Sequence, residues 1–411
     1  YYLHPDYHEA SPAAVESAPQ REAAAPRWSD RLQMTPSQQE SILKPAGWMH
    51  YRYPFIYGQP DTRQFPLATW RSAANWLHGG VRDPAWVIDH IDQDVPMLIE
   101  QIRTRVLPKR GIVAAPDEIL ITLGSQNALY LLTRLLLSST TRIGVENPCF
   151  REAINTFLLA DAEVVPHPVD EEGIVLNERP CDYYYVTPGH QVPTGVAMSS
   201  ARRRQLLDHA ARHDAVIIED DYDSESNFTL NPLPALKASD RSGRVVYVSS
   251  LSKALSPGLR LGFMVADPDL IDEARALRRL VYRHPPTNIQ YQMAHFLAQG
   301  HYETHLRRYH YDSAQRWERL HAALQRYLPS CRALAGSEHA NAFWLQTPAQ
   351  INTQQLTWRA AHAGVLIEPG ARHFLSAAPP DNYFRMGFHA INPDAIAQGV
   401  EVLRGQLEQM G

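Results

Sequence analysis

Short apolar runs alternate with helix-like stretches through the middle of the chain. The runs, several of them rich in β-branched residues, span residues 118–123, 142–146, 162–168, 182–188, 215–221, 244–249 and 261–267. Helix-like stretches such as Gln126–Leu137 and Ser199–His213 separate several of them. Strands of this length alternating with helices are typical of a mostly parallel sheet covered by helices on both faces. The pattern therefore predicts an α/β fold with a doubly wound sheet.

The pattern changes towards both ends of the chain. From about Pro268 it predicts long helices and then a strand pair near Asn341–Leu345 and Phe384–Phe388, which indicates a smaller α+β domain. Residues 9–27 are rich in Ala, Pro, Ser and Glu without apolar periodicity, which is typical of a flexible linker. The aromatic segment 1–7 before it looks like the end of another unit. We therefore expect a linker at 1–27, an N-terminal arm at 28–70, a large domain at 71–285 and a small C-terminal domain at 286–411.

Composition and charge narrow the class of protein. The 411 residues are 44% hydrophobic and 20% charged, as in an ordinary globular chain. A net charge of -5 argues against a surface built to clamp nucleic acid. The 3 cysteines are an odd number without metal-like spacing, which indicates a reducing, cytoplasmic setting. No apolar run approaches the roughly 20 residues of a membrane-spanning helix, so we expect no membrane partner.

The histidines do not indicate a metal site. The 19 histidines are scattered, and His301, His305 and His310 lie at helical spacing among arginines. A metal site at that spacing is one interpretation, and a solvated helix face is the one we adopt. We therefore assign no metal.

Polar residues follow many of the predicted strands. In open α/β sheets ligands bind beyond the carboxyl ends of the strands, so these residues should converge on one crevice. They are Gly124-Ser125-Gln126, Glu146-Asn147-Pro148, Thr187-Pro188-Gly189-His190, Asp220-Asp221-Tyr222 and Ser249-Ser250.

One part of this crevice has the donors of a phosphate site. Gly124 allows a tight turn, and the free N–H groups of the helix that follows can bind an anion. Ser250, Ser252 and Arg260 add hydroxyl and guanidinium donors, and the planar guanidinium suits phosphate. Each of these groups alone could lie in an ordinary solvated loop. Together they favour a phosphate.

Asp220 and Lys253 add the chemistry of a ring cofactor. Asp220 ends an apolar run, and its half-buried carboxylate would either cap or pair with a neighbour or hold a protonated ring nitrogen. Tyr222, two residues on, would point the same way and reach a neighbouring ring oxygen. The chain has only four lysines, and Lys253 is one of them. Because lysine is so rare here, the position of Lys253 among serines is not explained by composition alone. Alone it could be a surface lysine, but beside these groups it can form a Schiff base.

The combination of these residues resembles a known family. Asp220-x-Tyr222 and Ser250-x-x-Lys253, followed by Arg260, resemble the fold-type I pyridoxal-phosphate enzymes of the aspartate aminotransferase superfamily. Four longer motifs are similar to the MocR/GabR branch, whose members join a winged-helix DNA-binding domain to an aminotransferase-like domain. They are YGQPD (57–61), VTPGHQVPTG (186–195), EDDYDSE (219–225) and SLSKALSPGLRLG (250–262). The resemblance spans roughly residues 45–390.

The resemblance implies a role for each matching residue. Lys253 would form the internal aldimine with pyridoxal 5'-phosphate, Asp220 would pair with the pyridinium, and Tyr222 would bond the ring hydroxyl. Arg385 would take the carboxylate of an effector or substrate. The phosphate would be held by Ser125, Gln126, Ser250 and Arg260, and Phe150 would stack on the ring.

Two features depart from the family pattern. Ordinary aminotransferases carry Asn-Pro-x-Gly where this chain has residues 192–195 (VPTG), so His190 or Gln191 must supply the contact of that Asn or the contact is missing. Ser226 and Asn227 separate Glu225 from Phe228, where the family has Glu followed directly by Phe.

Taken with the resemblance, the sequence predicts a ligand-sensing domain of a MocR-type transcription regulator. An amine or amino acid with an acidic group would displace Lys253 and form an external aldimine. The domain would be a homodimer in which residues 53–61 reach the neighbouring subunit's site, and it would act on DNA only through a winged-helix domain before residue 1. The alternatives are a pyridoxal-phosphate-dependent aminotransferase and a non-catalytic scaffold, which the intact Lys253 and Asp220 disfavour.

Overall fold

The computed structural model describes residues 27–42, 44–56, 58–80, 86–177, 179–226, 233–333 and 341–410. The chain divides into two compact units, Tyr1–Gln39 and Glu40–Gly411. In the first unit the described residues form two short 3-10 helices, Trp28–Asp30 and Pro36–Gln38. Segment 1–7 and the predicted linker up to residue 26 lie outside the described residues. The sheets and cavities below belong to the second unit.

The main sheet has eight strands in the order β2-β9-β8-β7-β6-β3-β4-β5. In chain order they are β2 (Ile119–Thr122), β3 (Arg142–Asn147), β4 (Glu163–Asp170), β5 (Gly173–Ile174), β6 (Tyr183–Val186), β7 (Val216–Asp221), β8 (Val245–Ser250) and β9 (Gly262–Val265). The pairs from β4 through β3, β6 and β7 to β8 are parallel, whereas β9 runs antiparallel to β8 and β2. Each predicted apolar run overlaps one of these strands, so the predicted α/β fold is confirmed. The reversal at β9 was not predicted.

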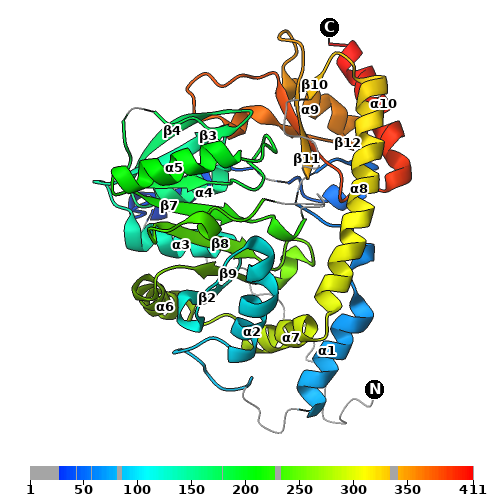
Figure 1. The fold of residues 1–411 in the computed structure, drawn as a ribbon. Helices are drawn as coiled ribbons and strands as arrows, with labels where there is room; N and C mark the ends of the chain where they lie inside the picture. The colour runs from blue at the N-terminus through cyan, green and yellow to red at the C-terminus, as the bar shows by residue number, and fades with distance from the viewer. Residues whose placement is uncertain are drawn as a thin grey trace. The chain divides into compact units, whose positions relative to one another are not determined.

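Helices cover both faces of this sheet, as Figure 1 shows. Neighbouring residues of one strand point to opposite faces, and both sides are buried: Tyr184 packs in the cluster of α5 (Ser200–Arg212), and Tyr185 packs in that of α3 (Ser125–Leu136) and α4 (Arg151–Leu158). α6 (Pro268–Tyr282) lies on the same face as α3. A strand buried on both sides needs a continuous apolar run, which explains why these strands were readable in the sequence.

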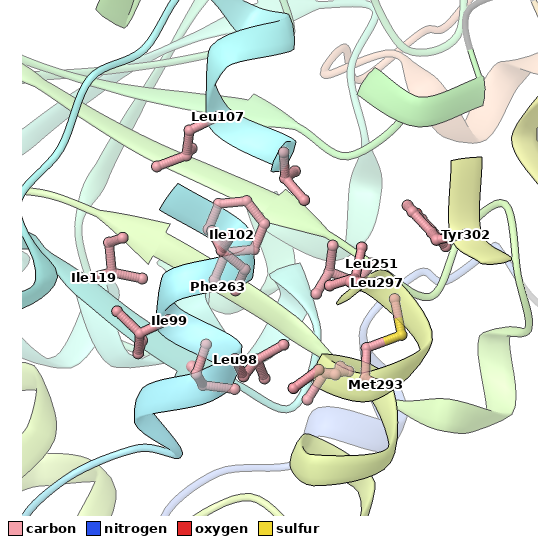
Figure 2. Packing of buried hydrophobic residues seen from close by; sticks show 14 of the residues in the cluster. Leu98, Ile99, Ile102, Leu107, Ile119, Leu251, Phe263, Met293, Leu297 and Tyr302 are labelled. Atoms are coloured by element: carbon pink, nitrogen blue, oxygen red, sulfur yellow. The ribbon is translucent and has the colours of Figure 1, made fainter. Parts of the chain in front are cut away.

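A third cluster anchors the segment that carries Lys253. Figure 2 shows Leu251 packed near Leu297 and Tyr302, and the same cluster contains Ala254 and Leu255. Its helical elements include α2 (Pro96–Gln101), a π-helical turn (Ile102–Val106), a 3-10 turn (Leu107–Arg110), α7 (Thr287–Ala298) and the start of α8 (His301–Tyr327). Buried residues on both sides of Lys253 therefore fix the backbone of this loop.

The C-terminal part is built on a long helix and a smaller sheet. α8 (His301–Tyr327) runs along one side of this unit and packs on α10 (Ile396–Glu408) (Figure 1). The antiparallel sheet has the order β10-β11-β14-β13, formed by β10 (Arg332–Ala333), β11 (Ala342–Gln346), β14 (Tyr383–Gly387) and β13 (Glu368–Pro369). α9 (Thr353–His362) precedes β12 (Val365–Leu366). β11 and β14 confirm the predicted strand pair. The domain boundary predicted after residue 285 falls between α6 and α7 and stays a prediction.

The N-terminal arm is attached to this C-terminal part. β1 (Tyr53–Pro54) pairs in parallel with β12, and Phe55 N donates a 2.9 Å hydrogen bond to Leu366 O. α1 (Leu67–Gly80) then packs against α7. In the described part of the chain, no helix has both the length and the apolar content needed to cross a membrane.

Candidate cofactor site

A cavity of about 310 Å³ lies beyond the carboxyl ends of β7 and β8. It brings together all eight residues that the sequence assigned to the cofactor. They are Ser125, Gln126, Phe150, Asp220, Tyr222, Ser250, Lys253 and Arg260. Lys44, Gly58, Gln59, Val192, Ser252 and Pro257 complete the lining. The rule that ligands bind beyond the carboxyl ends of parallel strands and the family resemblance linked these segments in advance, and the structure places them around one space.

The Lys253 amine lies in this cavity between an aromatic ring and a glycine. Its Nζ is 5.1 Å from the centre of the Tyr222 ring, and a Cβ added to Gly58 would stand 3.2 Å from it. Burial lowers the pKa of Lys253 to about 8; Asp223 opposes this shift, whereas Arg385 and Lys44 add to it. A lowered pKa makes a neutral, nucleophilic amine available near neutral pH, as a Schiff-base lysine requires.

Asp220 presents one carboxylate oxygen for which no described residue supplies a donor. Its Oδ2 accepts a 2.8 Å hydrogen bond from the Tyr185 hydroxyl, while its buried Oδ1 has no hydrogen-bond partner among the described residues. Burial raises the pKa of Asp220 to about 7, the Tyr185 hydrogen bond opposes this, and Asp221 raises it further. An unsatisfied buried carboxylate oxygen is costly. A ligand that brings a protonated ring nitrogen would satisfy it, so the residues present fit a pyridine cofactor.

The start of α3 has the geometry of an anion site. Gly124 precedes it with φ 83°, and a Cβ at Gly124 would stand 2.9 Å from Nη2 of Arg260. That Nη2 donates a 2.8 Å hydrogen bond to Leu123 O, so the guanidinium lies directly on the turn. Ser250, the last residue of β8, pairs with Gly262, whose added Cβ would meet Gly124 Cα at 2.7 Å. Helix N–H groups, a hydroxyl and a guanidinium thus gather at one place, as phosphate binding needs.

Three polar side chains lie differently from what the sequence indicated. Ser252 accepts a 2.7 Å hydrogen bond from Leu261 N and donates one of 3.0 Å to Leu261 O, so its hydroxyl closes the loop instead of facing an anion. Gln126 Nε2 donates a 2.9 Å hydrogen bond to Thr156 Oγ1, which joins α3 to α4. The group that Gln126 can offer to an anion is therefore its backbone N–H at the start of α3. The Tyr222 hydroxyl donates to His190 O at 3.0 Å.

The loop that departs from the family pattern presents an apolar side chain to the cavity. Gln191 Nε2 donates 2.7 Å hydrogen bonds to Pro148 O and Val192 O, and its Oε1 accepts from Thr194. His190 lies 3.7 Å from Asp223 and lines a separate small cavity. Val192 is therefore the residue of this loop that lines the cavity. The second departure, at Asn227, lies outside the described residues.

Arg385 lies in a neighbouring cavity of about 530 Å³, which shares Lys44, Phe150 and Lys253 with the first. On the antiparallel pair β13 and β14 it stands opposite Glu368, with 3.5 Å between Nη1 and Oε1. His373 Nε2 lies 2.8 Å from the same Oε1. Burial raises the pKa of Glu368, but the His373 hydrogen bond and the Arg385 charge outweigh it and bring the pKa to about 2. Glu368 is therefore ionised and holds the guanidinium in place.

Sequence reasoning missed Glu368 and Lys44 as parts of this site. The signal for Glu368 was its position directly after the buried apolar run 365–367. Lys44 is one of only four lysines, which was the signal for it. Among the described residues no group of His, Cys, Asp and Glu has the arrangement of a metal site. His305 and His310 instead bond the backbone oxygens of Ala254 and Glu225 at 2.8 and 2.7 Å.

The sequence and the fold are similar to those of known proteins. The family model for aminotransferase class I and II matches residues 92–402. A solved structure of LysN, the α-aminoadipate aminotransferase of Thermus thermophilus, superposes with a TM-score of 0.82 and is 25% identical, covering 93% of this chain and 99% of that one. That structure is complexed with N-(5'-phosphopyridoxyl)-L-leucine. Fold and site thus define an aminotransferase-like, pyridoxal-phosphate-binding protein.

Two curated relatives specify the branch. The HTH-type transcriptional regulator TauR of Rhodobacter capsulatus is 38% identical over 354 residues, which cover 85% of this chain and 72% of the relative. The probable rhizopine catabolism regulatory protein MocR of Rhizobium meliloti is 33% identical over 361 residues, covering 86% and 72%. The chain belongs to the MocR-type transcription regulators with an aminotransferase-like domain, which confirms the resemblance seen in the motifs.

Proposed function

We propose that this chain senses a small primary amine that carries an acidic group, using pyridoxal phosphate held on Lys253. The observation that carries the proposal is the single cavity in which the Lys253 amine, the unpartnered Oδ1 of Asp220 and the anion site at Ser125 meet. The neighbouring cavity adds Arg385 within the same space as Lys253. An amine that reaches Lys253 thus finds a guanidinium for its acidic end.

Each residue has a role that its position supports. The cofactor supplies a carbonyl carbon that bonds primary amines. Lys253 would hold this carbon, Asp220 would bind the ring nitrogen, and Phe150 and Val192 would line the space for the ring. Tyr222, whose hydroxyl donates to His190 O, would bond the ring oxygen. The phosphate would be held by Ser125, Ser250, Arg260 and the backbone N–H of Gln126.

We further propose a homodimer that acts on DNA through a winged-helix domain joined by the linker at 1–27. TauR and MocR are regulators of the HTH type, and the matched part of each covers 72% of its length, which supports a further domain in this protein. The arm at 28–70, the large domain at 71–285 and the small domain at 286–411 remain the proposed division of this chain.

Absorbance spectroscopy tests the proposal. The purified protein should bind pyridoxal phosphate with the yellow absorbance band of a lysine-linked cofactor, and Lys253→Ala should abolish the band. Lys109→Ala is the matched control because Lys109 lies 3.8 Å from Glu303 on α8, outside the cavity. A band retained in Lys253→Ala would exclude the assignment of Lys253.

A second measurement separates the sensor from an aminotransferase, the rival supported by the similarity to LysN. A panel of amines with and without acidic groups should shift the band, and adding a keto-acid acceptor should give little or no sustained turnover. Rapid multiple turnover would establish the enzyme instead. A protein that responds to no amine would contradict the sensing function altogether.

A further inference from the structure

A second lysine reaches the space beside Lys253. A Cβ placed on Gly58 would stand 3.2 Å from Nζ of Lys253 and 3.9 Å from Nζ of Lys44. The two amines therefore approach the same point. Lys44 lines both the cofactor cavity and the cavity of Arg385, although the residue as a whole is exposed at their rim. Lys44 thus borders the same space as Lys253.

The chain directly before Lys44 is fastened to the wall of these cavities. Glu40 O accepts a 2.8 Å hydrogen bond from Asn155 Nδ2, and Ile42 N donates one of 3.2 Å to Glu152 Oε1. Arg372 Nη1 donates a 2.7 Å hydrogen bond to Ser41 O. Residues 40–42 are thus held by α4 on one side and by the turn after β13 on the other. This attachment ends two residues before Lys44.

The charges around Lys44 favour an anion. Burial lowers the pKa of Lys44, the Glu368 charge opposes this and the Arg385 charge adds to it, so all three groups act on one another. Oε1 of Glu368 already has two partners, His373 Nε2 at 2.8 Å and Arg385 Nη1 at 3.5 Å. Within the described part of the chain, no carboxylate forms an ion pair with Lys44. An acidic group placed between Lys44 and Arg385 would balance a surplus of positive charge.

We propose that Lys44 is a specificity-determining residue that binds the acidic group of the effector together with Arg385. This inference rests on the proposed sensing function and adds the residue that selects acidic amines over neutral ones. A single acidic group can contact both Lys44 and Arg385, since both side chains border the same cavity.

Effector titrations of the cofactor-loaded protein test the role of Lys44. The probes are glycine, β-alanine, 4-aminobutyrate and 2-aminoethanesulfonate, with β-alaninamide as the acid-free counterpart of β-alanine. For each acidic amine that shifts the absorbance of the wild type, Lys44→Gln should raise the half-saturating concentration about tenfold or more, because a charge-assisted contact is lost. The response to β-alaninamide should change much less, since Lys44 acts on a neutral amine only through the pKa of Lys253. Lys44→Arg should restore most of the affinity, and Lys109→Gln should behave as wild type.

The outcomes separate this inference from the function on which it rests. If Lys44→Gln keeps the cofactor band and titrates with acidic amines as the wild type does, the role of Lys44 is wrong and the sensing function stands. If Lys44→Gln weakens the binding of β-alanine and of β-alaninamide equally, the proposed role of Lys44 is also wrong. Lys44 would then support the structure of the site without distinguishing acidic from neutral amines. If none of the amines shifts the absorbance of the wild-type protein, both the role of Lys44 and the sensing function are wrong.

Discussion

Tyr185 donates a 2.8 Å hydrogen bond to Oδ2 of Asp220 across two neighbouring parallel strands, β6 and β7. Both side chains are buried, and the bond determines which carboxylate oxygen remains for a ligand. It also opposes the effect of burial, which raises the pKa of Asp220 to about 7. The tyrosine thus keeps a larger fraction of Asp220 ionised at neutral pH, in the form that attracts a protonated ring.

Tyr185→Phe should weaken the binding of pyridoxal phosphate about tenfold at pH 7, since a hydrogen bond to a charged group contributes about 1.5–3 kcal/mol. The loss should be larger at pH 6 than at pH 8, because the pKa of Asp220 rises further without the tyrosine. Equilibrium titration of the apo protein measures it. Tyr184→Phe is the control: its hydroxyl lies 2.7 Å from His209 Nε2 on the opposite face of the sheet. Equal losses in the two variants would contradict the prediction.

Gly58 combines a left-handed backbone with a close approach to Lys253. Its φ is +73°, and an added Cβ would stand 3.2 Å from the Lys253 amine. Gly58→Ala should therefore cost about 1 kcal/mol of stability through the backbone and also displace the amine by a few tenths of an ångström. We expect a lower melting temperature and several-fold weaker cofactor binding, measured by thermal unfolding and absorbance.

Gly243 separates the two effects of the Gly58 substitution. It has φ +71°, but an added Cβ would meet no heavy atom within 4 Å. Gly243→Ala should lower the melting temperature by a similar amount and leave cofactor binding unchanged. If Gly58→Ala also leaves cofactor binding unchanged, Gly58 does not position Lys253.

Much of the site could be predicted because parallel strands end at one edge of a sheet. Asp220 and Ser250 end buried strands, and Ser125 begins the helix after another, so the topology alone brings them together. Side-chain direction within a loop has no such rule. Ser250 and Ser252 were indistinguishable in the sequence, and only the return of the chain at Leu261 engages the Ser252 hydroxyl, although Ser252 still lines the cavity.

Contacts between side chains from distant parts of the chain could not be predicted from the sequence. Glu368 faces Arg385 through the register of β13 and β14, and β13 has only two residues, too few to show a period of two. Lys44 lies in a segment without regular structure, whose residues 40 and 42 are joined to side chains of α4 by hydrogen bonds. The direction of β9 likewise depends on the turn at Pro257–Leu259 and not on the apolar pattern of the strand.

The lowered pKa of Lys253 predicts how fast the apo protein takes up its cofactor at each pH. Only the neutral amine adds to a carbonyl, and burial brings the pKa of Lys253 down to about 8. Below that pH the neutral fraction falls tenfold per unit, so the rate of band formation should rise with pH and level off slightly above pH 8. An ordinary lysine would show a rate still rising towards its usual pKa of about 10.4. Stopped-flow absorbance after mixing with pyridoxal phosphate measures the profile.

Two substitutions should move this profile in opposite directions. Asp223 raises the pKa of Lys253, so Asp223→Asn should shift the inflection to lower pH. Lys44 lowers it, so Lys44→Gln should shift the inflection to higher pH, by less because Lys44 is exposed to solvent. Shifts in the same direction, or a wild-type inflection near 10, would show that the charges around Lys253 do not prepare its amine. Opposite shifts would show that Lys44 has two effects. Its positive charge would bind the acidic group of the effector and would also lower the pKa of Lys253, which keeps that amine reactive.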